Sequence, residues 1–114
     1  MTIKIIKEKI ILDELKKIAE ENFGDMIKGA VDVEKKVVAL GGEMHIDANE
    51  ELIKTGSEQQ NIWGFNIHIN RPREDWLEFN SLINIKPAVG NRSMNIENET
   101  IRKKIKGIFN ELIK

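Results

Sequence analysis

The chain has 114 residues, of which 40% are hydrophobic and 32% are charged, and its formal net charge is −1. This length and composition predict one globular domain spanning residues 1–114, and the balanced charge argues against nucleic acid as a partner. Cysteine is absent, which excludes disulfides and thiolate metal sites, and no apolar run reaches the ~18 residues of a membrane span, so we expect a cytoplasmic protein without a membrane partner.

The first quarter of the chain predicts one strand and one helix. Residues 3–7 are β-branched and interrupted by lysines, which is typical of a short strand. Residues 12–23 carry apolar side chains at the spacing of one helical face. Gly24 follows at the position where a left-handed residue ends a helix.

Two β-rich runs follow, at residues 26–33 and 37–46, and only three residues join them. So short a link predicts an antiparallel hairpin. The pair Gly41-Gly42 interrupts the second strand and predicts a bulge or a close approach of backbone. A short helix is expected over residues 47–55, with Asp47 or Asn49 as its N-cap.

The second half of the chain predicts another hairpin and a final helix. Residues 62–70 alternate strictly between apolar and polar side chains, and residues 76–86 form the partner strand. An irregular loop covers residues 87–96, and a helix over residues 99–113 begins after Asn98 as N-cap.

The element order β-α-β-β-α-β-β-α predicts an α+β fold with a mostly antiparallel sheet of about five strands and three helices. We expect the three helices to cover one face of this sheet. The other face then becomes the place to search for a functional site.

Alternate positions near the end of the second hairpin strand are polar. If that strand continues to Asp47, then Glu43, His45 and Asp47 project from one face, and His68 lies on the polar side of the next long strand. Imidazole and carboxylate groups bind divalent metals, and a histidine between carboxylates is typical of acid–base catalysis. Glu43, His45 and Asp47 are therefore the catalytic candidates of a metal-assisted or acid–base hydrolase.

His45, His68 and Glu43 are the candidates for metal ligands, but no HExxH motif accompanies them. We therefore expect no metal and no cofactor. The simpler interpretation is a solvated sheet face on which Asp47 caps the following helix.

A second set of polar residues leads into the long loop. Lys86 and Arg92 are suited to binding a phosphate or carboxylate, while Asn91 and Ser93 add neutral hydrogen bonds. Together with His45, these four residues form the candidate site for a small anionic ligand, which is the leading functional hypothesis. The alternative is an ordinary crossover whose Asn and Ser residues cap turns.

A third hypothesis involves no catalysis. Trp76 and Leu82 fall on the polar side of the predicted strand 76–86, next to a sheet face that helices leave open. Exposed apolar residues on such a face are typical of a homodimer interface.

Several short motifs together resemble a family of small prokaryotic proteins known only as a domain of unknown function. These motifs are Phe23-Gly24-Asp25-Met26, Gly41-Gly42-Glu43 with His45 and Asp47, Gly56-Ser57-Glu58-Gln59, Ile62-Trp63-Gly64, and Asn84-Ile85-Lys86-Pro87 leading to Gly90-Asn91-Arg92-Ser93. The resemblance covers nearly the whole chain. It implies a self-standing domain and supplies no catalytic residues.

Overall fold

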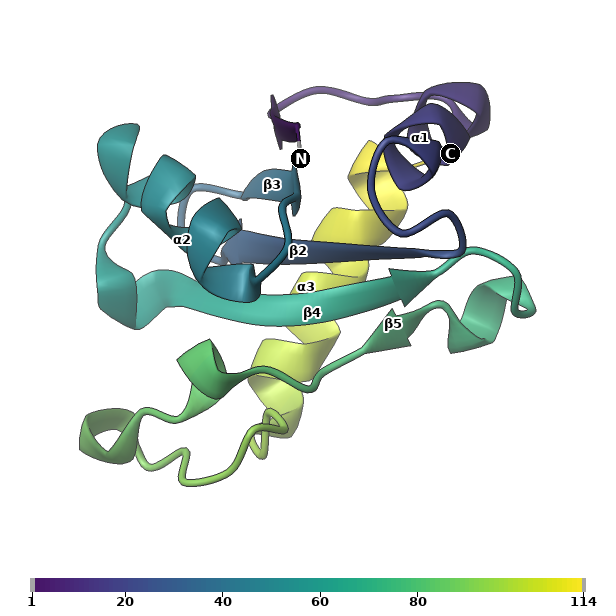
Figure 1. Ribbon diagram of the computed structural model, residues 1–114. Coiled ribbons are helices and arrows are strands. Elements are labelled where there is room, and N and C mark those ends of the chain that lie inside the picture. The colour runs from purple at the N-terminus through teal and green to yellow at the C-terminus, as the bar shows by residue number, and fades with distance from the viewer. Residues whose placement is uncertain (1, 114) are drawn as a thin grey trace.

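The computed structural model describes residues 2–113 and confirms the predicted α+β fold and element order (Figure 1). The elements are β1 (Ile3–Ile6), α1 (Leu12–Glu20), β2 (Met26–Asp32), β3 (Val37–Gly41), α2 (His45–Lys54), β4 (Ile62–His68), β5 (Leu77–Glu78) and α3 (Glu99–Leu112). Among residues 2–113, no helix combines the length and the apolarity needed to cross a membrane.

One antiparallel sheet holds the five strands in the order β1-β3-β2-β4-β5. The two longest strands, β2 and β4, pair over their full length, from Met26 opposite His68 to Asp32 opposite Ile62. The β2–β3 hairpin turns as predicted, and Asp32 Oδ1 accepts hydrogen bonds from the backbone N–H groups of Glu34 and Lys35 at 2.9 and 3.0 Å. The Asp32 side chain thus holds the turn, and Lys36 takes the positive φ, 57°, that glycine or asparagine more often supplies.

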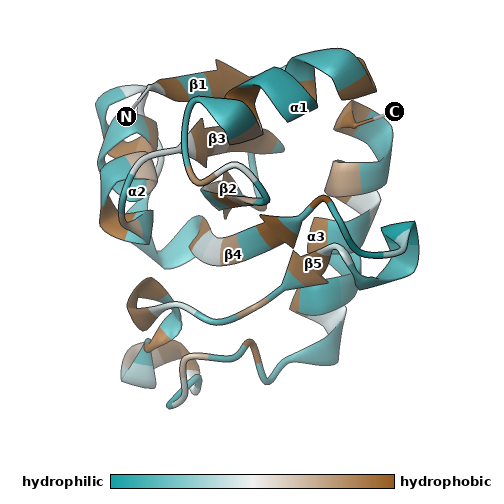
Figure 2. Ribbon diagram, turned by 45° about the vertical axis from the view of Figure 1, so that its right-hand side comes forward, coloured by the Kyte–Doolittle hydropathy of each residue, from teal (hydrophilic) through white to brown (hydrophobic). Residues whose placement is uncertain are grey.

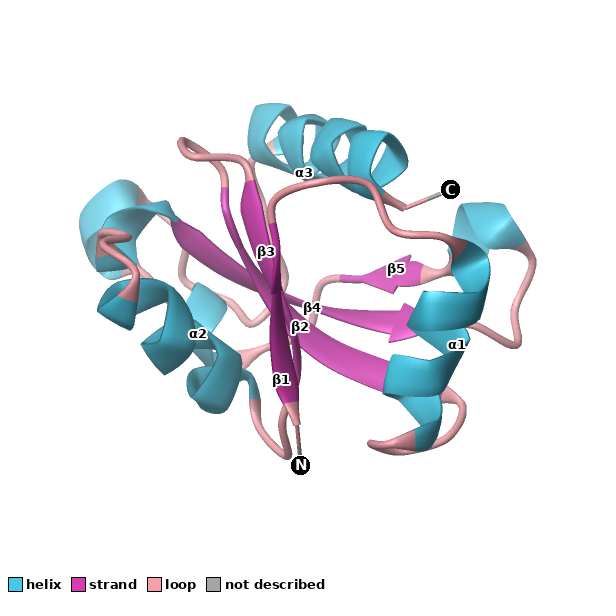
Figure 3. Ribbon diagram, turned by 90° about the horizontal axis from the view of Figure 1, so that it is seen from above, coloured by secondary structure: helices cyan, strands magenta, loops and turns pink. Residues whose placement is uncertain are grey.

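Helices cover both faces of this sheet, so the expectation that all three would lie on one face is wrong. Figure 3 shows α1 and α3 on one side of the strands and α2 on the other. The ribbons of α1 and α2 mix brown and teal in Figure 2, as expected for amphipathic helices that each bury one side. Because α2 packs mainly over β2 and β3 and also contacts β1 and β4, it leaves only part of its face of the sheet open.

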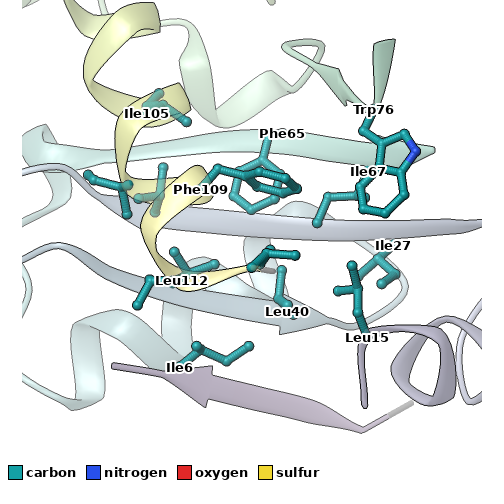
Figure 4. Close-up of a cluster of buried hydrophobic side chains, with 14 of the residues drawn as sticks. Ile6, Leu15, Ile27, Leu40, Phe65, Ile67, Trp76, Ile105, Phe109 and Leu112 are labelled. Atoms are coloured by element: carbon teal, nitrogen blue, oxygen red, sulfur yellow. The ribbon is translucent and has the colours of Figure 1, made fainter. Parts of the chain in front are cut away.

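The main core lies between the sheet and the pair α1 and α3 (Figure 4). The predicted alternation of β4 is confirmed, because Trp63, Phe65 and Ile67 all point into this core. The second, smaller core under α2 is built mainly from small side chains. Its buried members are Ala30, Ala39, Ala48, Leu52 and Ile62.

Trp76 belongs to the main core, so its predicted place on a polar face is wrong. The residue has helical backbone angles after the 3₁₀ turn Arg73–Asp75 and stands before β5, outside the strand alternation. Its ring meets Phe109 edge to face at 6.4 Å between centroids, and its Nε1–H donates to the Arg71 carbonyl at 2.7 Å. Trp76 is therefore unavailable to a dimer interface.

The predicted strand 37–46 ends at Gly41, and α2 begins at His45. Gly41 and Gly42 have φ angles of 114° and 96°, which residues other than glycine rarely adopt. A Cβ on Gly41 would lie 2.1 Å from the Thr2 carbonyl oxygen, so the predicted close backbone approach is confirmed. Asp47 lies in the first turn of α2, where its Oδ2 accepts the backbone N–H of Met44 at 3.0 Å.

The predicted strand 76–86 is regular only at Leu77–Glu78, after which the chain forms irregular backbone and a 3₁₀ turn at Leu82–Asn84. The fully buried side-chain amide of Asn84 makes the hydrogen bonds to β4 that a strand backbone would otherwise make. Its Oδ1 accepts the Gly64 N–H at 2.7 Å, and its Nδ2 donates to the Gly64 carbonyl at 3.0 Å. One side chain thus extends the hydrogen-bond ladder of β4 by one position.

Candidate functional site

A hollow of about 560 Å³ opens on the α2 side of the sheet, where that helix leaves the strands uncovered. Lys28 of β2 and Asn66 of β4 form part of its floor. One wall is the start of α2, with Met44, His45 and Ile46, and the other is formed by residues 80–83 together with Met94. The walls are largely apolar, and Leu82 is 65% exposed at the rim.

The polar groups at this hollow form a chain of hydrogen bonds. His45 Nε2 lies 2.8 Å from Asn66 Oδ1 and 3.1 Å from the carbonyl oxygen of Phe65. Asn66 Nδ2 donates to Glu78 Oε1 at 2.9 Å, and His68 Nε2 lies 3.1 Å from the same oxygen. The register places these residues together, since Asn66 stands opposite both Lys28 of β2 and Glu78 of β5.

The environment fixes the charge of two members of this chain. Burial lowers the pKa of His45, and the positive charge of Lys28 lowers it further, against the hydrogen bonds to Asn66 and Phe65. Hydrogen bonds from Asn66 and His68 lower the pKa of Glu78. At neutral pH a neutral imidazole therefore lines the hollow. The Glu78 carboxylate is ionised and binds the floor residue Asn66, but it does not itself line the hollow.

Lys28 supplies the positive charge of the hollow. It is half-buried, and its ammonium lies 5.5 Å from the centre of the Phe23 ring. Within residues 2–113, no carboxylate comes within ion-pairing distance of it. The first turn of α2 carries the Asp47 carboxylate, which already accepts the backbone N–H of Met44.

The structure separates the residues that the sequence grouped around His45. Because α2 replaces the expected strand, Glu43 and Asp47 line a different, shallow hollow with Glu50 and Glu51. In the part of the chain that the structure describes, no group of three or more His, Asp or Glu side chains is placed to hold a metal ion. The alternating strand on which the hydrolase hypothesis depended is not formed.

Lys86 also lies apart from His45. Its ammonium donates to the Gln59 carbonyl at 3.0 Å and stands 5.4 Å from the centre of the Trp63 ring, in a separate hollow that includes Val89. Burial lowers the pKa of Lys86. Lys86 therefore stays a candidate for anion binding, but at a place that His45 does not share.

The remaining loop candidates hold the loop itself together. Asn91 is buried, and its Nδ2 donates to the carbonyls of Asn84, Ser93 and Asn95 at 2.7 to 3.1 Å. The Glu97 carboxylate accepts the backbone N–H groups of Arg92 and Ser93 and the Ser93 hydroxyl. Hydrogen bonds from the Arg92 N–H and from the hydroxyl and N–H of Ser93 lower the pKa of Glu97. The turn-forming alternative thus accounts for Asn91 and Ser93.

Lys28, Asn66 and Glu78 were not among the sequence-predicted site residues, although the alternation of residues 62–70 puts Asn66 on the polar side of its strand. A signal for Lys28 does exist, because it is the one charged residue inside the run Met26–Val31. A charged side chain on a central strand has to extend either to water or into a polar binding site. No comparable signal marks Glu78, since it follows a stretch rich in exposed charges.

A family model for a protein of unknown function, DUF5674, matches residues 4–112. The chain belongs to the DUF5674 family. The match confirms the resemblance to a family of unknown function that the short motifs indicated, and DUF5674 supplies no activity to carry over. No curated protein and no solved structure shows significant similarity to this DUF5674 chain.

The lowered pKa of His45 makes the stability of the fold depend on pH. The unfolded chain takes up a proton near the ordinary value of about 6.5, while folded His45 resists it, so the free energy of unfolding falls as pH decreases through that range. Glu78 acts in the same direction at lower pH, because its stabilisation is lost as pH falls through its lowered folded pKa. We expect His45→Gln to reduce the difference in unfolding free energy between about pH 7.5 and about pH 5, measured by urea denaturation.

The exposed-site variant Lys16→Gln serves as the control and should keep the wild-type difference. An unchanged pH dependence in His45→Gln would show that this imidazole protonates as readily in the folded chain as in the unfolded one.

Proposed function

We propose that this DUF5674 domain binds a small anionic ligand with an apolar body in the hollow between the start of α2 and residues 80–83. The observation that carries the proposal is half-buried Lys28, whose ammonium has no carboxylate partner within residues 2–113, on the floor of an otherwise largely apolar hollow. A partly desolvated cation of this kind favours an anion over water.

The size and lining of the hollow support a ligand of modest size. A volume of about 560 Å³ falls within the roughly 300–1,000 Å³ of small-molecule sites. Met44, Ile46 and Leu82 leave apolar surface open that a hydrocarbon body would cover.

A series of carboxylates tests the proposal. By isothermal titration calorimetry, we expect affinity to increase from butyrate to octanoate, as the buried chain lengthens, and octanol to bind more weakly than octanoate. Lys28→Met should weaken octanoate about tenfold, the effect of losing one charge-assisted hydrogen bond. Lys16→Met, which removes an exposed lysine from α1 on the opposite face, should leave the affinity unchanged.

Two further outcomes would redirect the proposal. If Lys86→Met weakens octanoate and Lys28→Met does not, the anion binds in the separate hollow beside Trp63. If octanoate fails to bind and light scattering shows a dimer that Leu82→Asp dissociates, the apolar rim serves the homodimer instead.

A further inference from the structure

The position of His45 determines which of its ring nitrogens carries the proton. Nε2 lies 3.1 Å from the carbonyl oxygen of Phe65, and a backbone carbonyl can only accept a hydrogen bond. The second neighbour of Nε2, at 2.8 Å, is Asn66 Oδ1, which is also an acceptor. His45 therefore carries its proton on Nε2.

Glu78 secures the orientation of the Asn66 amide. An ionised carboxylate accepts only, so the Asn66 group that faces Glu78 Oε1 at 2.9 Å has to be the NH₂. The oxygen of the amide then faces His45. His68 donates to the same carboxylate oxygen at 3.1 Å and helps to keep Glu78 ionised. Asn66 and Glu78 thus act as positioning residues for the imidazole.

The opposite ring nitrogen of His45 is left with a free lone pair. A neutral imidazole protonated on Nε2 has an acceptor on Nδ1. Within residues 2–113, no group donates a hydrogen bond to Nδ1, and Nδ1 is not among the buried atoms without a partner. His45 and Lys28 both line the hollow, so a ligand bound there contacts both residues.

We propose that the ligand carries a hydrogen-bond donor beside its anionic group, which His45 Nδ1 accepts: a 2-hydroxy or 2-acylamino carboxylate with an apolar side chain. This inference rests on the proposed anion site. An unsubstituted carboxylate offers only acceptors, so it satisfies Lys28 and leaves Nδ1 without a donor. An O–H or N–H on the neighbouring carbon satisfies both groups at once. A free small acid and the C-terminal residue of a peptide share this chemistry.

Matched ligands that differ only in the donor test the inference. At about pH 7.5, where His45 is neutral, 2-hydroxyoctanoate should bind about fivefold more tightly than 2-methoxyoctanoate, the effect of one net hydrogen bond. N-acetylnorleucine should be preferred over its N-methylated form by a similar factor. A pentapeptide ending in norleucine distinguishes the two sources, because it binds as well as N-acetylnorleucine only if the hollow accepts a peptide chain.

His45→Phe should abolish the preference for the donor, so that 2-hydroxyoctanoate and 2-methoxyoctanoate bind this variant with equal affinity. The tautomer provides a readout that needs no variant, since ¹⁵N chemical shifts of the ligand-free protein should show His45 protonated on Nε2. Protonation on Nδ1, or equal binding of the hydroxy and methoxy acids by the wild type, would overturn the inference and leave the anion site standing. If no carboxylate binds at all, the proposed function fails, and the inference fails with it.

Discussion

Asn84→Asp is expected to lower the free energy of unfolding by about 3 kcal/mol, although it exchanges only one NH₂ group for an oxygen. The Asn84 amide is fully buried, and its Nδ2 donates to the carbonyls of Gly64 and Met94, both at 3.0 Å. In the variant an oxygen faces those two carbonyls, so two buried acceptors lose their donor and a carboxyl group is buried with them. Urea denaturation at neutral pH measures the loss.

Asn80→Asp is the matched control, because Asn80 is exposed and the same exchange there should change stability by less than about 0.5 kcal/mol. The destabilisation by Asn84→Asp should also shrink towards acid pH. Burial raises the pKa of the introduced carboxyl, so the folded variant loses stability as pH rises through the ordinary aspartate range. A loss in Asn84→Asp that matched the Asn80→Asp value would show that the ladder of β4 does not depend on this amide.

Gly64→Ala is expected to cost about 2 kcal/mol and to weaken ligand binding at the same time. A Cβ at this position would lie 2.6 Å from Ser81 Oγ, 2.7 Å from Ser81 Cβ and 2.9 Å from Ile83 Cγ1. Relief of these clashes requires residues 81–83 to move away from β4. That segment forms one wall of the hollow, so octanoate affinity should decrease along with the unfolding free energy.

Gly107→Ala, the same glycine-to-alanine exchange, is expected to raise the free energy of unfolding instead of lowering it. Gly107 lies within α3, and nothing comes within 4 Å of a Cβ placed there. Alanine should stabilise the helix by about 0.5–1 kcal/mol and leave octanoate affinity unchanged. If Gly64→Ala is as stable as the wild type, the contact between β4 and residues 81–83 is looser than the structure shows.

Local patterns in the sequence predicted much of this fold correctly. The alternation of residues 62–70 identified which β4 side chains enter the core, and Asn98 was confirmed as the N-cap of α3. Gly24 has the expected left-handed backbone, with a φ of 88°, and its N–H binds the Ala19 carbonyl at 2.7 Å, although α1 itself ends earlier than predicted, at Glu20. Each of these features depends on contacts between residues close in the chain, so the sequence pattern contains the necessary information.

Features that depend on distant contacts were missed. Residues 82–86 alternate like a strand, but Asn84 reaches β4 with its side chain instead of its backbone. The start of α2 at His45 follows two glycines with positive φ, and the backbone N–H of Gly42 is bound by the distant Asn22 Oδ1 at 3.1 Å. The candidate site was predicted in part for the same reason: His45 was identified, whereas its partners Lys28, Asn66 and Glu78 are set by strand register.

The amide of Asn84 has a consequence for how these molecules behave at high concentration. An edge strand with free N–H and C=O groups is a template on which another chain can add a strand and begin to aggregate. Along β4, the outward groups at His68 and Asn66 are taken by the β5 segment, and those at Gly64 are taken by Asn84. The opposite edge is β1, which is only four residues long and carries the exposed Lys4. The Asn84 side chain thus blocks strand addition along the part of β4 that β5 leaves uncovered. The two edge strands, β5 and β1, are only two and four residues long and offer little template to another chain.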